Sequence, residues 1–256
     1  IPGRSSLLSW VAWQARIPQR IGVASGGRGF AQTLVAPRRP GQQHATDIYL
    51  SLAPACGIDL PPGERPPMEF YPADADRTAV TQRLIDELDW LGDVPLVVMH
   101  PGGGAGSVYE DPLKRWPSER FVLLANHLMR QHKARVLLVG SAHDHELATA
   151  IAGMTSQRCA NWAGRMTLGE LGALGEMASL YIGNDTGPTH VAAAVGCPTL
   201  AIFGPSNPAV SAPYSPAEGR VVTLWRGGEQ RPFTWQEGVL VSEAIKAADS
   251  LLRRKP

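Results

Sequence analysis

Hydrophobic runs of four to six residues alternate with amphipathic segments from residue 95 onward. The first run, Leu96–His100, ends at a proline and three glycines, which is typical of a buried strand that leads into a turn. Further strands are predicted over 135–140, 158–162, 179–183 and 198–203. Helices are predicted over 118–131 with Ser118 as N-cap, from 144, and over 168–178, 188–195 and 236–254. This alternation predicts βαβ units, and therefore an α/β fold with a parallel sheet covered by helices on both faces.

The first 70 residues follow a weaker pattern and are rich in Pro, Gly and Arg. The elements predicted there are a helix over 5–15, a strand over 20–24, a loop over 25–43 and a helix over 46–56. Prolines and a glycine between 61 and 67 indicate a linker, and a polar helix is predicted over 74–91. We therefore expect a partial first domain with its linker at 1–92, an α/β domain at 93–235 and a C-terminal helix at 236–256.

Composition excludes several classes of protein. The 24 Lys and Arg residues nearly balance the 23 Asp and Glu residues, so a strongly basic face for nucleic acid is not expected. Hydrophobic residues make up 44% and charged residues 18% of the chain, which is typical of a globular protein rather than a disordered one. The three widely spaced cysteines indicate neither a disulfide framework nor a zinc site, so a reducing compartment is expected.

Many of the 27 glycines and 22 prolines follow the predicted strands, at the edge where parallel sheets bind their ligands. In the first of these turns, residues 100–106, consecutive glycines allow backbone N–H groups to approach an anion, and Lys114 can neutralise a phosphate. The spacing is neither the Walker pattern nor the dinucleotide-binding fingerprint. The alternative is a flexible loop that ends in a solvated pair, Lys114 and Arg115.

A second turn spans residues 183–190 and reads GNDTGPTH. Pro188 is typical of a first helical turn, so the N–H groups of that helix are expected to point at the sheet edge and hold a phosphate. Asp185 is either a cap or a carboxylate that faces a substrate hydroxyl. His190 either reaches the same pocket or packs against the sheet.

The turn at 140–146 offers Asp144, which either accepts hydrogen bonds from a ribose or caps the next helix. His143 and His145 are two residues apart, whereas two metal ligands on one helical face are four apart. No metal site is therefore expected. The turn at 203–208 either forms a wall of the site or is simply rich in proline.

Three stretches together resemble glycosyltransferase family 9, whose members include the ADP-heptose:lipopolysaccharide heptosyltransferases. They read HPGGGAGSVYEDPLKRWP from residue 100, NWAGRMTLGELGAL from residue 161 and GNDTGPTHVAAAVGCPTLAIFGPSNP from residue 183. The resemblance covers residues 90–210 well and residues 1–60 more loosely, and it favours the heptosyltransferase II-like branch. It implies a GT-B architecture of two Rossmann-like domains, in which the C-terminal domain holds the nucleotide sugar.

The resemblance also implies roles for individual residues. Lys114 matches the family lysine that contacts the donor diphosphate, and Lys114 and Asp185 are the expected catalytic residues. The implied donor-binding residues are Gly102, Gly103, Asp144, Met166, Thr167, Thr186, Gly187, Pro188 and His190. Among these, Asp144 is expected at the ribose, and Met166 and Thr167 near the adenine.

The implied activity is inverting transfer of a heptose from ADP-heptose to a sugar of the lipopolysaccharide core, with no cofactor and no required metal. The expected location is the cytoplasm, where the protein can lie against the inner face of the cytoplasmic membrane. We expect the family's first strands and its catalytic base to precede Ile1. The alternatives are therefore a nucleotide-sugar-binding fragment without transfer activity, or a GT-B transferase that uses another nucleotide sugar.

Overall fold

The computed structural model describes residues 6–23, 28–36, 44–61, 65–104, 111–157, 159–227 and 232–253. The chain forms two compact units, of which the first comprises Ile1–Pro66 with Ala209–Ser211 and the second Pro67–Pro208 with Ala212–Pro256. No helix among the described residues is both long and apolar enough to cross a membrane.

The first unit is built from short elements. They are α1 (Ser6–Gln14), β1 (Ile21–Val23), a 3-10 helix (Arg28–Ala31), β2 (Leu34–Ala36), α2 (Ala45–Leu50) and a second 3-10 helix (Pro54–Cys56). Strand β1 pairs in parallel with β2, which lies inside the segment expected to be a loop. The single helix expected over 46–56 is divided, because Pro54 starts a new 3-10 turn and cannot donate a backbone hydrogen bond. Residues 25–27 and 37–43 of the expected loop, and residue 24 of the expected strand, lie outside the described residues.

The second unit contains a parallel sheet of six strands in the order β5-β4-β3-β6-β7-β8. The strands are β3 (Leu96–His100), β4 (Arg135–Leu138), β5 (Ala160–Asn161), β6 (Leu180–Asn184), β7 (Thr199–Phe203) and β8 (Val221–Trp225). The parallel α/β sheet expected from the sequence is therefore confirmed. The sequence analysis does not predict β8, which pairs along its whole length with β7 at the edge of the sheet.

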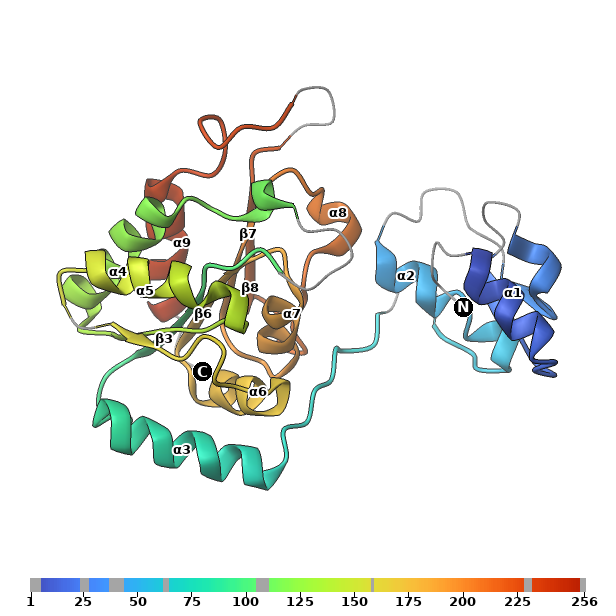
Figure 1. The fold of residues 1–256 in the computed structure, drawn as a ribbon, viewed down its shortest axis with the longest axis horizontal. Coiled ribbons are helices and arrows are strands. Elements are labelled where there is room, and N and C mark those ends of the chain that lie inside the picture. The colour runs from blue at the N-terminus through green and yellow to red at the C-terminus, as the bar shows by residue number, and fades with distance from the viewer. Residues whose placement is uncertain are drawn as a thin grey trace. The chain divides into compact units, whose positions relative to one another are not determined.

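Helices cover both faces of this sheet (Figure 1). One layer holds α4 (Ser118–His132), α5 (His145–Met154) and α9 (Val241–Arg253), and the other holds α3 (Asp74–Leu88), α6 (Leu168–Met177) and α7 (Gly187–Ala194). Alternate residues of β3 serve the two layers, since Val97 and Met99 pack with the α4 side, and Leu96 and Val98 with the α3 side. This alternation follows from the two-residue period of a strand.

Helix α3 belongs to the second unit, although the expected first domain extends to residue 92. The Arg77 guanidinium bonds to the Glu176 carboxylate at 2.7 Å and 2.9 Å. At the other end of the helix, Glu87 accepts from Trp162 Nε1 at 2.8 Å. Buried Val80 and Leu84 lie between these ties. The structural division therefore falls near Pro66, because α3 buries its apolar face against the sheet domain.

Several element boundaries differ from the expected ones. Pro117 rather than Ser118 is the N-cap of α4, and Ser118 is its first helical residue. Helix α9 begins at Val241 rather than at 236, where the Glu243 carboxylate accepts from the N–H of Leu240 at 2.8 Å. Strand β5 covers only Ala160–Asn161, and residue 158 of the expected strand lies outside the described residues. A short helix, α8 (Pro208–Ser211), lies within the turn segment after β7 and is not predicted.

Candidate functional site

The candidate site lies at the carboxyl ends of β3 and β6, the two central strands of the sheet. The chain proceeds from β3 outward through β4 and β5 on one side, and from β6 outward through β7 and β8 on the other. The register places His100 of β3 beside Gly183 of β6. In open α/β sheets such a change of direction leaves a crevice at the carboxyl ends of the strands, which is where ligands bind.

Lys114 and Asp185 form an ion pair in this crevice. Lys114 ends a short 3-10 helix, Pro112–Lys114, whose first turn is capped by the Asp111 carboxylate through the N–H of Leu113 at 2.9 Å. The Lys114 ammonium donates to Asp185 Oδ2 at 2.9 Å. The lysine side chain is 32% exposed and the aspartate side chain 8%. The ammonium therefore remains accessible to a ligand while the carboxylate beneath it is held in place.

Asn184 ties the loops around the ion pair together. Its side-chain oxygen accepts from the N–H of Trp116 at 3.1 Å. Its amide nitrogen donates to the carbonyls of Pro101 at 3.0 Å and Gly102 at 2.9 Å. Asn184 is completely buried, so loss of these bonds leaves buried polar groups without partners. No role was predicted for Asn184 from the sequence. A polar amide directly after the predicted apolar strand over 179–183 could have indicated a residue that holds loops at the site.

The glycine-rich loop after β3 lies directly on neighbouring side chains. A Cβ added to Gly102 would lie 2.4 Å from Asp144 Oδ1, and one added to Gly103 would lie 2.8 Å from Arg115 Cγ. Gly104 has a φ of +83°, a conformation that favours glycine. These glycines are required by close packing, which positions the loop beside Lys114.

Asp144 belongs to a buried network rather than to the surface of the site. Its Oδ2 accepts from the N–H of Ser141 at 2.9 Å and from the Ser141 hydroxyl at 2.7 Å. His100 Nε2 lies 3.7 Å away, and His100 Nδ1 lies 3.1 Å from Thr186 Oγ1. Burial raises the pKa of the Asp144 carboxyl, but interactions with His100 and Ser141 outweigh it and lower the pKa to about 2.

The expectation that Asp144 contacts a ribose stays a prediction. Asp144 is only 1% exposed, and its carboxylate is turned toward Ser141 and His100. Its other oxygen, Oδ1, is buried and has no hydrogen-bond partner among the described residues. The alternative reading of Asp144, as a residue that stabilises the start of the next helix, describes its observed contacts better.

An apolar cavity of about 210 Å³ opens beside this network. Its walls include His100, Val139, Met166, Thr167, Leu171 and Pro188. The fold here brings together two of the stretches that resemble the family: Met166 and Thr167 come from the stretch at residue 161, and Pro188 from the stretch at residue 183. Thr167 also caps α6, because its hydroxyl accepts from the N–H of Glu170 at 3.1 Å. A pocket with apolar walls and few polar groups has the character of a site for a planar base.

The N-terminus of α7 faces the same edge of the sheet. Thr186 is its N-cap, and Gly187 and Pro188 form its first turn. Gly187 is exposed and nothing lies within 4 Å of a Cβ placed there. The first N–H groups of a helix lack partners inside the helix and attract anions. Among the described residues, therefore, positive charge from Lys114 and hydrogen-bond donors from α7 lie at one edge of the sheet.

His190, which the sequence offers either to the pocket or to the sheet, does not line the apolar cavity. It is half-buried, and the residues that line the cavity include Pro188 but exclude His190. The neighbouring Thr189 is completely buried, and its hydroxyl donates to the Asn184 carbonyl at 2.6 Å. A role for His190 in donor binding stays a prediction.

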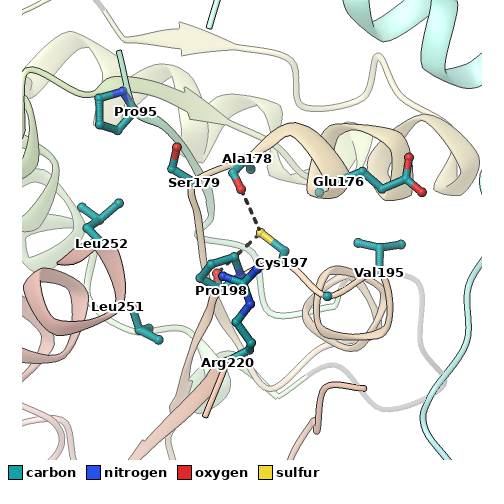
Figure 2. A pocket seen from close by; sticks show the side chains of 12 residues that line it. Pro95, Glu176, Ala178, Ser179, Val195, Cys197, Pro198, Arg220, Leu251 and Leu252 are labelled. Carbon is teal, nitrogen blue, oxygen red and sulfur yellow. Dashed lines mark hydrogen bonds between the residues drawn. The ribbon is translucent and has the colours of Figure 1, made fainter. Parts of the chain in front are cut away.

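A second hollow, of about 470 Å³, is distinct from the candidate site (Figure 2). It is lined by residues that precede strands of the sheet, including Pro95, Ser179 and Pro198. Cys197 lines it as well and is buried, with Sγ directed at the carbonyls of Ala178 and Pro198. Burial raises the pKa of Cys197 to about 12. This thiol therefore packs in the core and lacks the thiolate character of a nucleophile.

Comparison with known proteins gives the site its context. The family model described as glycosyltransferase family 9 (heptosyltransferase) matches residues 5–231. Lipopolysaccharide heptosyltransferase 2 of Salmonella typhimurium is 31% identical over 183 residues, which are 70% of this chain and 51% of that protein. The chain spans about half the length of the curated relatives it matches first.

Two solved structures share the fold. The glycosyl transferase family 9 structure from Veillonella parvula has a TM-score of 0.80 at 22% identity. The match covers 100% of this chain and 72% of the Veillonella chain. The E. coli ADP-heptose lps heptosyltransferase II structure has a TM-score of 0.77 at 23% identity, over 98% of this chain and 74% of its own. The expected GT-B-type α/β fold is thereby confirmed. Because the family model matches most of its residues, the chain belongs to glycosyltransferase family 9, the heptosyltransferase family.

Proposed function

We propose that this chain carries the donor-binding half of an inverting glycosyltransferase. In the proposed reaction a heptose moves from ADP-heptose to a sugar of the lipopolysaccharide core. The observation that carries the proposal is the accessible Lys114 ammonium, held 2.9 Å from Asp185 at the carboxyl edge of the sheet. The relatives named as lipopolysaccharide heptosyltransferases support the choice of heptose and acceptor.

Departure of ADP leaves negative charge on the diphosphate, and the site offers positive charge at that position. We propose that Lys114 turns from Asp185 to the diphosphate, and that the first N–H groups of α7 donate to the same group. Asp185 would then accept hydrogen bonds from hydroxyls of the sugar. The charge on Lys114 replaces that of a divalent cation, so we propose that transfer requires no added metal.

The apolar cavity is the proposed seat of the adenine. Its walls include Val139, Leu171 and Met166, which pack against a flat base, whereas Thr167 and Ser141 offer few polar contacts. The base that deprotonates the acceptor is proposed to come from outside the donor site. We further propose that the protein works in the cytoplasm, with its acceptor at the inner face of the cytoplasmic membrane. The three free cysteines support a reducing compartment.

Titration calorimetry with ADP and UDP, run beside a transfer assay, tests the proposal. We expect ADP to bind and UDP to bind at least tenfold more weakly, because the larger purine fills more of the apolar cavity. Transfer from ADP-heptose that persists in EDTA supports the metal-free mechanism. ADP binding without transfer would identify a donor-binding fragment. Tighter binding of UDP than of ADP would indicate another nucleotide sugar. If neither nucleotide binds, the donor site is refuted.

A further inference from the structure

Two histidines of α4 and one aspartate of α9 converge on a single point. His127 Nε2 lies 3.0 Å and His132 Nε2 lies 2.7 Å from the same oxygen of Asp249, Oδ1. The two imidazole ring centres are 6.2 Å apart. Each of the three side chains is about one-fifth exposed. Three groups that bind metals in other proteins are thus assembled at a position that solvent can reach.

This cluster lies at the opposite edge of the sheet from the donor site. Helix α4 follows Trp116, whose N–H is tied to Asn184 at the carboxyl ends of the strands. The helix then runs back along the sheet, so that His132, its last residue, shortly precedes the start of β4 at Arg135. The cluster is therefore separated from Lys114 and Asp185 by the length of the strands, and the proposed transfer reaction does not use it.

The chemistry of the three groups suits a borderline divalent cation. Imidazole nitrogen and carboxylate oxygen are ligands of zinc, with bonds of about 2.0–2.2 Å, and tetrahedral coordination then places ligand atoms about 3.3 Å apart. The observed separations of 3.0 Å and 2.7 Å are those of hydrogen bonds. To admit the ion, the nitrogen–oxygen separations would lengthen to about 3.3 Å, and the three ligand atoms already lie within 4.8 Å of one another. Each imidazole would carry its proton on Nδ1 instead of Nε2, and water would fill the fourth position.

The charges around the cluster set limits on the affinity. Lys246 and Arg253 lie one turn before and one turn after Asp249 on α9, and both are exposed. The Asp249 carboxylate nevertheless bonds to the two histidines. Solvent screens exposed charges strongly, so the two basic side chains lower the affinity for a metal ion without preventing its binding. Their presence disfavours hard cations, which depend on carboxylate charge, more than ions that bind imidazole.

We propose that His127, His132 and Asp249 form a binding site for a transition-metal cation of the zinc type. The ion would join the end of α4 to α9, two helices that pack on the same face of the sheet. Its role is structural, because binding to the folded state alone raises the stability of that state.

The test uses the full chain after removal of any affinity tag and treatment with a chelator. Zinc titration by calorimetry is expected to give one ion per chain, and Co²⁺ is expected to give the visible absorption bands of a tetrahedral site. Zinc should raise the melting temperature, whereas Mg²⁺ at the same concentration should not. H132A and D249N should each weaken zinc binding by at least tenfold.

Two control variants locate the ion. H143A changes an exposed histidine outside the cluster, and C56S removes the exposed thiol. Both should bind zinc as the unchanged protein does. If H132A fails to fold, H127Q provides a second ligand variant, and melting in EDTA verifies that each variant is folded. Absence of zinc binding, equal binding by the ligand variants, or loss of binding in H143A or C56S would each overturn the proposal.

Discussion

The Lys114 ammonium lies 2.9 Å from the Asp185 carboxylate, although 71 residues separate them in the chain. Lys114 comes from a short turn before α4, and Asp185 follows β6. The carboxylate is nearly buried while the ammonium is one-third exposed. The pair therefore places a partly exposed positive charge at the edge of the sheet, compensated by a nearly buried carboxylate.

Replacing Lys114 with alanine should remove most of the transfer activity. A single lost donor to developing charge costs roughly 10²–10³ in rate, so kcat should fall by about that factor. The melting temperature should fall only modestly, because the lysine is one-third exposed, although the Asp185 carboxylate that loses this partner is nearly buried. Lys246 is exposed on α9. K246A therefore serves as the matched control, and its transfer activity should be normal. Unchanged kcat in K114A would contradict the assignment.

Asp185→Asn should separate nucleotide binding from sugar binding. The amide keeps the size of the side chain but removes the negative charge beside the diphosphate. ADP, which has no heptose, should bind as tightly as before or more tightly. Transfer should fall by about 10- to 100-fold, since a hydrogen bond to a charged group contributes about 1.5–3 kcal/mol. Calorimetry with ADP and steady-state kinetics measure the two effects, and a parallel loss of both would show that Asp185 has only a structural role.

Asp144 should make the stability of the second unit sensitive to acid. Its pKa is lowered to about 2 from an ordinary value of 3.8, so its contribution is complete above about pH 4 and is lost as the pH falls toward 2. The size of the shift corresponds to about 2 kcal/mol. Urea unfolding should show D144N to be less stable than the unchanged protein at pH 7. The difference should shrink progressively below pH 4; a difference independent of pH would exclude this role.

Gly102→Ala should damage the donor loop. The added Cβ would lie 2.4 Å from Asp144 Oδ1, and the buried carboxylate has no room to withdraw. We expect a loss of about 1–3 kcal/mol in the free energy of unfolding together with weaker ADP binding. Gly153 in α5 is the matched control, because nothing lies within 4 Å of its added Cβ. G153A should stabilise the helix by about 0.5–1 kcal/mol. Equal behaviour of the two variants would contradict the close packing of the loop.

One of the three thiols should react in the native protein. Cys56 is exposed, whereas Cys159 and Cys197 are buried. Burial raises the pKa of each buried thiol to about 12, and alkylation requires the thiolate. Iodoacetamide at pH 8 should add one label, and denaturant should bring the number to three. Mass spectrometry distinguishes this result from rapid labelling of two or three thiols in the folded state.

Regular elements of the second unit were predictable because their signals are local. The buried run Leu96–His100 is a strand and the amphipathic segment that ends at His132 is a helix, as predicted. Strand β8 and the membership of α3 in the second unit were not predicted, although prolines and a glycine between 61 and 67 indicated the linker at which the chain divides. Both depend on partners far along the chain: β7 for the strand, and α6 for the helix α3 that follows the division.

The candidate site shows the same contrast. Lys114, Asp185, Met166, Thr167 and Pro188 could be named from motifs, since glycines and a proline mark the turns in which parallel sheets bind ligands. The ties made by Asn184 could not be named, because its three bonds join segments that are 68 to 83 residues away. The cluster on α4 and α9 was missed for the same reason: Asp249 lies 117 residues beyond His132.

By itself, the sequence determined the α/β class of this protein, the glycine-rich turns at the ends of its strands and the family to which those turns point. Periodicity and turn chemistry act over a few residues, so they can be read without the fold. Only the tertiary structure decided which candidate side chains are buried and which are exposed. It turned Asp144 inward to Ser141 and His100, left the Lys114 ammonium partly exposed, and joined two histidines to Asp249. Burial and long-range contacts control these outcomes, and both arise only when distant segments pack together.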